Sequence, residues 1–190
     1  MCGRFTLTLE VPELQRELGV GEFPSDFHTR YNIAPTQPVA VVRDVNTRRV
    51  EWMRWGLIPS WAKSDEIGSR LINARAETLT EKPSYRLPFL KQRCLILADG
   101  FFEWQKTTRG RSTPYYFKRK AHKPFAFAGL WSVWNPKRAQ AVTSCTIITC
   151  PANDIVLPVH DRMPVILDQA LMWRWLLEDD LVALQGMLKP

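Results

Sequence analysis

The stretch Cys94-Leu-Ile-Leu-Ala-Asp-Gly-Phe-Phe-Glu-Trp-Gln105 decides the fold that we predict for this chain. Its first five residues form a continuous apolar run, which is typical of a buried strand. Asp99-Gly100 interrupts the run, because both residue types favour turns. Phe101–Gln105 then resumes in an extended conformation and is expected to pair as a hairpin with Pro114–Lys118. This stretch therefore predicts a β-rich core.

The rest of the sequence adds further strands and a few short helices. Apolar and β-branched runs predict strands at 125–131, 143–150 and 165–167, and a hairpin between 39–43 and 49–55. Helices are predicted at 10–19, 84–92, 168–177 and 181–188. Residues 23–37 are expected to be irregular, 63–70 exposed and 71–78 extended. We therefore predict an α+β fold with one domain over residues 1–190, a mostly antiparallel, barrel-like sheet, and helices mainly near the two chain ends.

Composition narrows the class of protein. The 190 residues are 45% hydrophobic and 24% charged, as in an ordinary globular protein. A run of about 18 apolar residues, which a membrane helix needs, does not occur in the sequence. A basic segment followed by an apolar stretch, which would indicate a secretory signal, is not found at the N-terminus. We expect a monomer in the cytoplasm, at the nucleoid in a bacterium or in the nucleus in a eukaryote.

The charge balance favours a polyanionic partner. Twenty-six Lys and Arg residues against nineteen Asp and Glu residues give a net charge of +7, and the pI is about 9.5. Such a balance suits nucleic acid, although many basic proteins bind nothing in particular. Eight Trp and nine Phe residues add to the signal, because aromatic faces and cations together form single-strand-binding surfaces. The predicted hairpin tip is basic as well, with Lys106, Arg109 and Arg111.

The four cysteines divide into one candidate for chemistry and three core thiols. Cys94, Cys145 and Cys150 show no metal-ligand spacing with each other or with Cys2, so no metal or cofactor is expected. Cys2 differs because removal of Met1 would give it a free α-amine next to its thiol. Such a 1,2-aminothiol condenses with an aldehyde to an imine and then closes a thiazolidine ring. The alternative is that Cys2 is an incidental residue at a frayed terminus.

Three internal residues are candidates for acid–base or polar roles. His160 lies between Pro158 and Pro164, and its ordinary pKa suits proton transfer, although a structural role is equally compatible with its position. Glu103 lies among aromatic residues, where desolvation would favour its protonated form; the alternative is an edge-strand charge that prevents aggregation. Asn73 follows two aliphatic residues, which indicates a buried amide that needs partners.

Three arginines are candidates for phosphate contacts. Arg4, Arg75 and Arg162 could each hold a phosphate through the guanidinium group. Taken singly, each is better explained as surface charge.

Six short blocks, in order along the chain, resemble the SOS-response-associated peptidase (SRAP) family. They are Met1-Cys-Gly-Arg-Phe5, Tyr31-Asn-Ile-Ala-Pro-Thr36, Trp55-Gly-Leu-Ile-Pro-Ser-Trp61, Leu71-Ile-Asn-Ala-Arg-Ala-Glu-Thr78, Ala98-Asp-Gly-Phe-Phe-Glu-Trp104 and His160-Asp-Arg-Met-Pro164. Each block is a weak signal alone, but six in register are specific.

The resemblance implies a DNA-repair activity with a defined set of site residues. Family members form a covalent crosslink between the N-terminal Cys and an abasic sugar in single-stranded DNA. The implied catalytic residues are Cys2, Asn73, Glu103 and His160. The implied DNA contacts are Arg4, Asn32, Pro35, Trp61, Arg75 and Arg162. Two rival interpretations are an N-terminal-nucleophile cysteine peptidase that uses Cys2 and His160, and a non-covalent single-strand-binding module.

Overall fold

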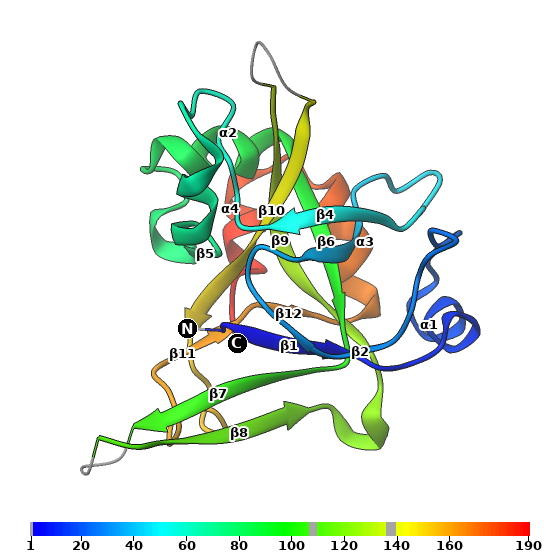
Figure 1. Cartoon of the computed structure of the whole chain (residues 1–190), viewed down its shortest axis with the longest axis vertical. Helices are drawn as coiled ribbons and strands as arrows, with labels where there is room; N and C mark the ends of the chain where they lie inside the picture. Colours follow the sequence, from blue (N-terminus) through cyan, green and yellow to red (C-terminus); the bar gives the residue numbers. More distant parts are fainter. Residues whose placement is uncertain (1, 107–109, 136–139) are drawn as a thin grey trace.

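The computed structural model describes residues 2–106, 110–135 and 140–190, and its core is built from β-strands (Figure 1). The strands are β1 (Arg4–Leu7), β2 (Arg30–Ile33), β3 (Pro38–Val42), β4 (Glu51–Trp55), β5 (Asn73–Arg75), β6 (Arg93–Ala98), β7 (Gly100–Lys106), β8 (Ser112–Lys118), β9 (Phe125–Trp134), β10 (Val142–Pro151), β11 (Arg162–Pro164) and β12 (Ile166–Leu167). The helices are α1 (Val11–Leu18), α2 (Pro83–Lys91), α3 (Gln169–Leu177) and α4 (Leu181–Gly186), with short 3₁₀ turns η1 (Asp65–Arg70), η2 (Ala76–Thr78) and η3 (Lys120–His122).

Five strands close into a barrel in the order β10-β4-β3-β6-β9 and back to β10. The closure is visible at Cys145, which is paired with Trp55 of β4 on one side and with Trp131 of β9 on the other. The β10–β4 pair is parallel, and the other four pairs of the ring are antiparallel. The predicted α+β class with a mostly antiparallel, barrel-like sheet is confirmed.

A second sheet, in the order β2-β1-β7-β8, lies across one end of the barrel (Figure 1). Its inner face is aromatic. Phe5 of β1 contacts Trp55 at a ring-centroid distance of 5.1 Å and Phe127 at 5.5 Å, in edge-to-face geometry. Such pairs add to the stabilisation that comes from burial. The barrel and the second sheet therefore share one hydrophobic core, and the N-terminal strand runs through it.

The expectation of an irregular segment over 23–37 is wrong at Arg30–Ile33. These residues form β2, which pairs antiparallel with β1, with Phe5 opposite Ile33. The strand is short and irregular in register, and only Ile33 of its four residues is buried, so its own sequence carries no alternating pattern. Its conformation is set by pairing with a distant strand, which local propensity does not reveal.

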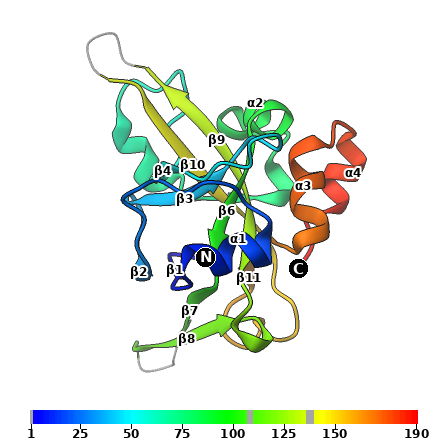
Figure 2. The same ribbon diagram turned by 90° about the vertical axis from the view of Figure 1, so that its right-hand side faces the viewer.

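Helices α2, α3 and α4 lie on one side of the barrel, and α1 lies apart from them, near β1 (Figure 2). Helices α2 and α3 pack on β6 and β9. Arg93, at the start of β6, is buried and donates hydrogen bonds to the carbonyl oxygens of Phe89 (3.0 Å) and Trp175 (2.8 Å), at the C-terminal ends of these two helices. A guanidinium there satisfies carbonyl groups that have no partner within the helix. This cation therefore joins both helices to the barrel.

The segment after β4 is more constrained than expected. Gly56 has φ +121°, and a Cβ atom there would lie 2.5 Å from the carbonyl oxygen of Gly68 in η1. The predicted exposed segment 63–70 is therefore anchored at Gly68, which is buried. The predicted extended segment 71–78 is extended only over Asn73–Arg75, where β5 pairs in parallel with β10. Helices of the described part of the chain are all too short or too polar to cross a bilayer.

Candidate active site

Cys2 lies inside the protein, immediately before β1. Its side chain has no solvent exposure, and Sγ donates a hydrogen bond to the carbonyl oxygen of Arg4 at 3.7 Å. Burial raises the pKa of the Cys2 thiol far above its ordinary value, and the negative charge of Glu103 raises it further. The thiol is therefore held in its neutral form in the absence of a ligand, and a base must remove its proton before it can react.

Asn73 reaches Cys2 from β5. Its Nδ2 donates a hydrogen bond of 2.8 Å to the Cys2 carbonyl oxygen. The backbone of Asn73 is itself held by pairing with Ile147 and by the Tyr85 hydroxyl, which donates to the Asn73 carbonyl oxygen at 3.2 Å. Asn73 Oδ1 is buried and accepts no hydrogen bond from the residues that the structure describes. A buried amide oxygen in this state is suited to a donor on a ligand.

Glu103 enters the same region from β7. Arg4 of β1 is opposite Phe102, so continuing the antiparallel register brings Gly3 opposite Glu103. Gly3 has no side chain to cover the carboxyl group. Glu103 is only 1% exposed, and burial raises its pKa, an effect that the nearby positive charge of His160 partly offsets. The alternative of an edge-strand charge is wrong, because β7 lies between β1 and β8 and the side chain points inward.

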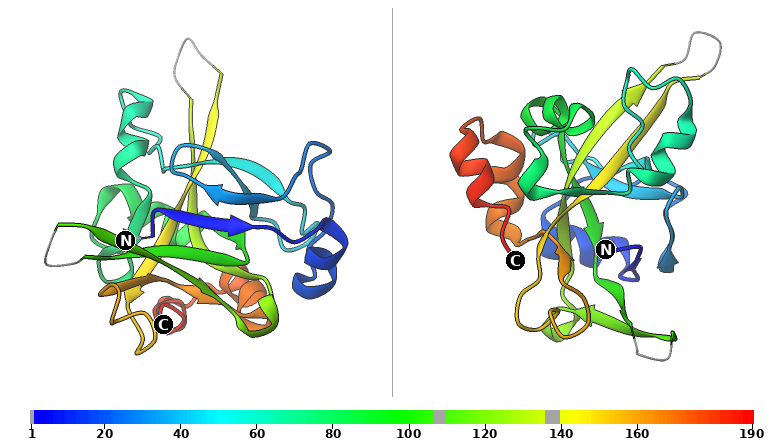
Figure 3. Two further views of the ribbon diagram at one scale, coloured as in Figure 1. Left: turned by 60° about the horizontal axis from the view of Figure 1, so that its bottom comes forward. Right: turned by 90° about the vertical axis from the view of Figure 1, so that its left-hand side faces the viewer.

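His160 is brought to Glu103 by the loop between β10 and β11, which Figure 3 shows beneath the second sheet in its left-hand view. The loop is tied to β7 by Gln105, whose Nε2 donates to the Pro158 carbonyl oxygen at 2.8 Å. Gln105 and Glu103 are two apart on a strand, so both face this loop. The backbone N–H of Arg162 donates to His160 Nδ1 at 3.0 Å. The Asp161 carboxylate lies 3.0 Å from the same nitrogen, so Nδ1 has both a donor and an acceptor as neighbours.

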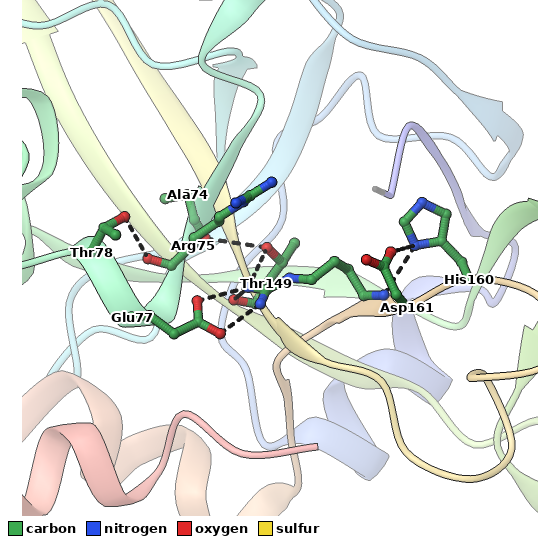
Figure 4. Close-up of polar contacts among 8 residues, drawn as sticks. Ala74, Arg75, Glu77, Thr78, Thr149, His160 and Asp161 are labelled. Carbon is green, nitrogen blue, oxygen red and sulfur yellow. Dashed lines mark hydrogen bonds and ion pairs between the residues drawn. The ribbon is translucent and has the colours of Figure 1, made fainter.

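The three candidate phosphate-binding arginines differ in their surroundings. Arg75, at the end of β5, is exposed. Arg4 is half-buried and donates from Nη1 to the Gly3 carbonyl oxygen at 2.8 Å. Arg162 is 13% exposed in its side chain and is paired with Glu77, with Nη1–Oε1 at 2.5 Å and Nη2–Oε2 at 3.0 Å (Figure 4). Only Arg75 of the three therefore presents an exposed guanidinium.

The remaining candidate DNA contacts lie on the surface between β2 and η1. Trp61 is 59% exposed and borders a pocket of about 590 Å³ that also contains Lys63 and Arg70. Asn32 is exposed on β2, and Pro35 is half-buried in the turn that follows it. These residues offer stacking and polar groups at the surface, whereas Cys2 and Glu103 are buried.

The outer face of the second sheet carries an aromatic group that the sequence indicated only by alternation. Phe102 and Trp104 face away from Glu103, and Phe102 packs on Tyr116 of β8 with ring centroids 4.8 Å apart. Trp104 is 37% exposed and Tyr116 is 40% exposed. Arg4 is opposite Phe102, so this face joins aromatic rings to a cation next to the candidate site. At the basic tip, Arg111 is exposed and Arg109 lies outside the described residues.

The other cysteines are core thiols, as predicted. Cys94, Cys145 and Cys150 are free and fully buried, and burial raises the pKa of Cys150 to about 11. Clusters of three or more metal-ligating side chains are not found among residues 2–106, 110–135 and 140–190.

The barrel and its site define a class of protein in which a cysteine just before the first strand is buried at the end of a closed β-barrel, in the same region as an amide, a carboxyl group and an imidazole. The chain belongs to the SOS response associated peptidase (SRAP) family, whose sequence profile matches residues 1–190. The resemblance of the six sequence blocks is thereby confirmed.

Named relatives and a solved structure agree with this assignment. The chain is 42% identical over 195 residues to the abasic site processing protein YoqW of Bacillus subtilis strain 168, covering 100% of this chain and 87% of YoqW. It is 33% identical over 211 residues to the abasic site processing protein HMCES of Gallus gallus, covering 88% of this chain and 62% of HMCES. A crystal structure of a Bacteroides thetaiotaomicron protein superposes with a TM-score of 0.90 at 27% identity, covering 100% and 87% of the two chains.

Proposed function

We propose that this protein processes abasic sites in single-stranded DNA by forming a covalent crosslink through Cys2 after Met1 has been removed. The observation that carries the proposal is the 2.8 Å hydrogen bond from Asn73 to the Cys2 carbonyl oxygen, which ties the N-terminus into the region of Glu103 and His160. The names of the relatives and the net charge of +7 support DNA as the partner. Such a role places the protein at the nucleoid or in the nucleus.

The chemistry balances without an oxidant or a metal. The neutral α-amine of Cys2 adds to C1 of the ring-opened abasic sugar, and loss of one water gives an imine. The thiolate then adds to the imine carbon while the nitrogen takes up the proton, and a thiazolidine results. Because amine and thiol belong to one residue, ring closure is intramolecular, for which effective molarities of about 10⁵ M or more are known. Ring closure removes the imine, which would otherwise favour β-elimination and strand cleavage.

The surrounding residues have roles that follow from their environments. Burial raises the pKa of Glu103, so its carboxyl group suits proton donation to the departing hydroxyl. His160 is the second candidate for proton transfer, and it can accept the thiol proton. Asn73 would hold the sugar or the new ring through its buried amide oxygen.

DNA would approach across the basic and aromatic surface around this site. Arg4, Arg75 and Arg162 are the proposed phosphate contacts, while Trp61 and the Asn32–Pro35 loop would flank the strand. Phe102 and Trp104 add stacking faces next to Arg4. An abasic site has no base to read, so we expect little sequence specificity. One monomer would act on each lesion.

The test is a denaturing gel with a single-stranded oligonucleotide that carries one abasic site. Protein lacking Met1 should give a shifted band that survives denaturation. Cys2→Ala protein, and protein with an N-terminal extension that keeps Cys2 internal, should give none. An intact oligonucleotide is the control for the lesion. A shifted band of wild-type intensity with Cys2→Ala would overturn the proposal.

One observation also favours a second function. The Asp161 carboxylate lies 3.0 Å from His160 Nδ1, an arrangement that also occurs where a histidine activates a cysteine nucleophile. A peptidase would turn over peptide substrates and would lose that turnover in both Cys2→Ala and His160→Ala. Self-removal of Met1 is the simplest such reaction. Mass spectrometry of the N-terminus of freshly made His160→Ala protein would show whether Met1 is retained.

A further inference from the structure

We propose that Glu77 is a positioning residue: its carboxylate fixes the orientation of the Arg162 side chain, and Arg162 in turn supports the ring of His160. The same carboxylate weakens DNA binding. This inference rests on the proposed function. Glu77 lies between two of the proposed phosphate contacts. Its carboxylate is hydrogen-bonded to Arg162, and the charges of Arg162 and Arg75 both act on it, which together hold the pKa of Glu77 below its ordinary value. The carboxylate is therefore ionised at neutral pH.

The contacts of Arg162 fix its guanidinium in one place. Glu77 accepts from both Nη atoms, and Nη2 also donates to the carbonyl oxygen of Thr149 at 2.7 Å and to its hydroxyl at 3.3 Å (Figure 4). Two parallel bonds between a guanidinium and a carboxylate define an orientation as well as a distance. The pair is asymmetric, since the Arg162 side chain is 13% exposed and that of Glu77 is 47% exposed. Glu77 therefore closes over Arg162 from the solvent side.

The same arginine is coupled to the candidate catalytic histidine. Its backbone N–H is the donor to His160 Nδ1, and its Cα is paired with Pro151 of β10. The side chain of Arg162 is thus held by β10 and Glu77, and its main chain holds the imidazole. Loss of the Glu77 carboxylate would leave the Arg162 side chain held by β10 alone. The ring of His160 would then lose part of the support that sets its orientation.

Glu77 also competes with DNA. A phosphate presents oxygens to a guanidinium in the same bidentate way as a carboxylate. The charge of Glu77 cancels one of the arginines that surround the site, and it repels the DNA backbone. Removing this charge should therefore strengthen binding and weaken catalysis, two effects of opposite sign. A residue that only stabilised the fold would not separate them.

The test compares Glu77→Gln with Glu51→Gln. Glu51 of β4 is a matched control, because it forms an Arg–Glu pair of 2.7 Å with Arg43, is 36% exposed in its side chain and is not part of the proposed site. Binding is measured with an oligonucleotide that carries a tetrahydrofuran analogue, which has no aldehyde and cannot react. Crosslinking is measured as a single-turnover rate at saturating DNA with a true abasic site.

Glu77→Gln should bind the tetrahydrofuran oligonucleotide more tightly, with a salt dependence steeper by about 0.7 for one added phosphate contact. Its crosslinking rate at saturating DNA should fall about tenfold or more, as expected for a misplaced proton-transfer group. Glu51→Gln should match wild type in both. Glu77→Asp, which keeps the charge on a shorter side chain, should recover wild-type salt dependence and part of the rate.

Two results would overturn the inference: an unchanged crosslinking rate in Glu77→Gln, or weaker binding together with slower crosslinking. If Glu77→Gln does not fold, as judged by thermal unfolding, the same two measurements are made on Glu77→Asp. A wild-type crosslinking rate together with wild-type affinity in Glu77→Asp would then overturn the inference. Absence of a crosslink with wild-type protein would instead count against the proposed function.

Discussion

At the scale of single residues, the buried carboxyl group of Glu103 is the feature that most needs a functional reason. It is 1% exposed on a strand whose neighbours Phe101 and Phe102 are aromatic. An apolar residue would pack there without the desolvation that a carboxyl group suffers, so Glu103 lowers stability, as expected for a residue with the proposed role in proton transfer.

Glu103→Gln should slow crosslinking by about 10²-fold, because the amide keeps the shape of the side chain but cannot transfer a proton. Affinity for a tetrahydrofuran oligonucleotide should stay within about twofold, since Glu103 faces the interior. Single-turnover kinetics and fluorescence anisotropy measure the two quantities. A large loss of affinity with an unchanged rate would show that Glu103 has a structural role.

The raised pKa of Glu103 also predicts a pH dependence of stability. The folded protein binds this proton more tightly than the unfolded chain, in which a Glu titrates near pH ~4.3. The contribution is therefore most favourable below about pH 4.3 and is lost as pH rises through the raised folded pKa. The free energy of unfolding of Glu103→Gln minus that of wild type should increase over this window. Urea titrations at several pH values measure the difference, and a constant difference would contradict the assignment.

At the scale of elements, the position of Cys2 depends on how β1 is anchored. The buried Asp99 carboxylate accepts from Thr6 Oγ1 at 2.5 Å, from the Thr8 backbone N–H at 2.5 Å and from Thr8 Oγ1 at 2.7 Å. The turn between β6 and β7 thereby holds the end of β1. The sequence identified Asp99 only as a strand breaker, because its partners are about ninety residues away in the chain.

Asp99→Ala should lower the free energy of unfolding by about 2–4 kcal/mol, because it leaves several buried donors without an acceptor. It should also slow crosslinking, since Cys2 lies two residues before β1 and depends on it for its position. Glu10→Ala is the control: Glu10 is exposed and makes no side-chain cap for α1, so its effect should be within about 0.5 kcal/mol. A wild-type midpoint of urea unfolding for Asp99→Ala would contradict this role.

Elements with a local signal could be predicted, and those defined by partners could not. The run Cys94–Ala98 and the hairpin that follows it were predicted because apolar patterning and turn residues coincide. Strands β2 and β5 are short and are defined by pairing with β1 and β10, which lie far away in the sequence. The site shows the same limit: Asn73 and Cys2 are 71 residues apart, so only the family resemblance could join them.

At the scale of the whole molecule, a net charge of +7 implies that DNA binding is largely electrostatic. The exposed guanidinium of Arg75 is the clearest proposed phosphate contact that no described salt bridge occupies. Its removal should weaken binding without changing the buried chemistry.

Arg75→Ala should reduce the magnitude of the slope of log K against log salt by about 0.7, the value for one phosphate on a single strand. The crosslinking rate at saturating DNA should remain near that of wild type. Arg49→Ala removes the same charge from an exposed position outside the proposed site and should leave the slope unchanged. Equal changes in both variants would show that net charge, rather than a contact by Arg75, is responsible.

The most direct test of a Cys2 thiazolidine is intact mass spectrometry of the crosslinked species, with and without borohydride. The expected mass is that of the protein without Met1 plus the abasic oligonucleotide minus one water, unchanged by borohydride, with peptide mapping locating the oligonucleotide on Cys2. A crosslink that gains two hydrogens on reduction and leaves the Cys2 thiol open to alkylation would be an imine, and it would contradict the thiazolidine. So would the absence of any crosslink in protein shown to begin at Cys2.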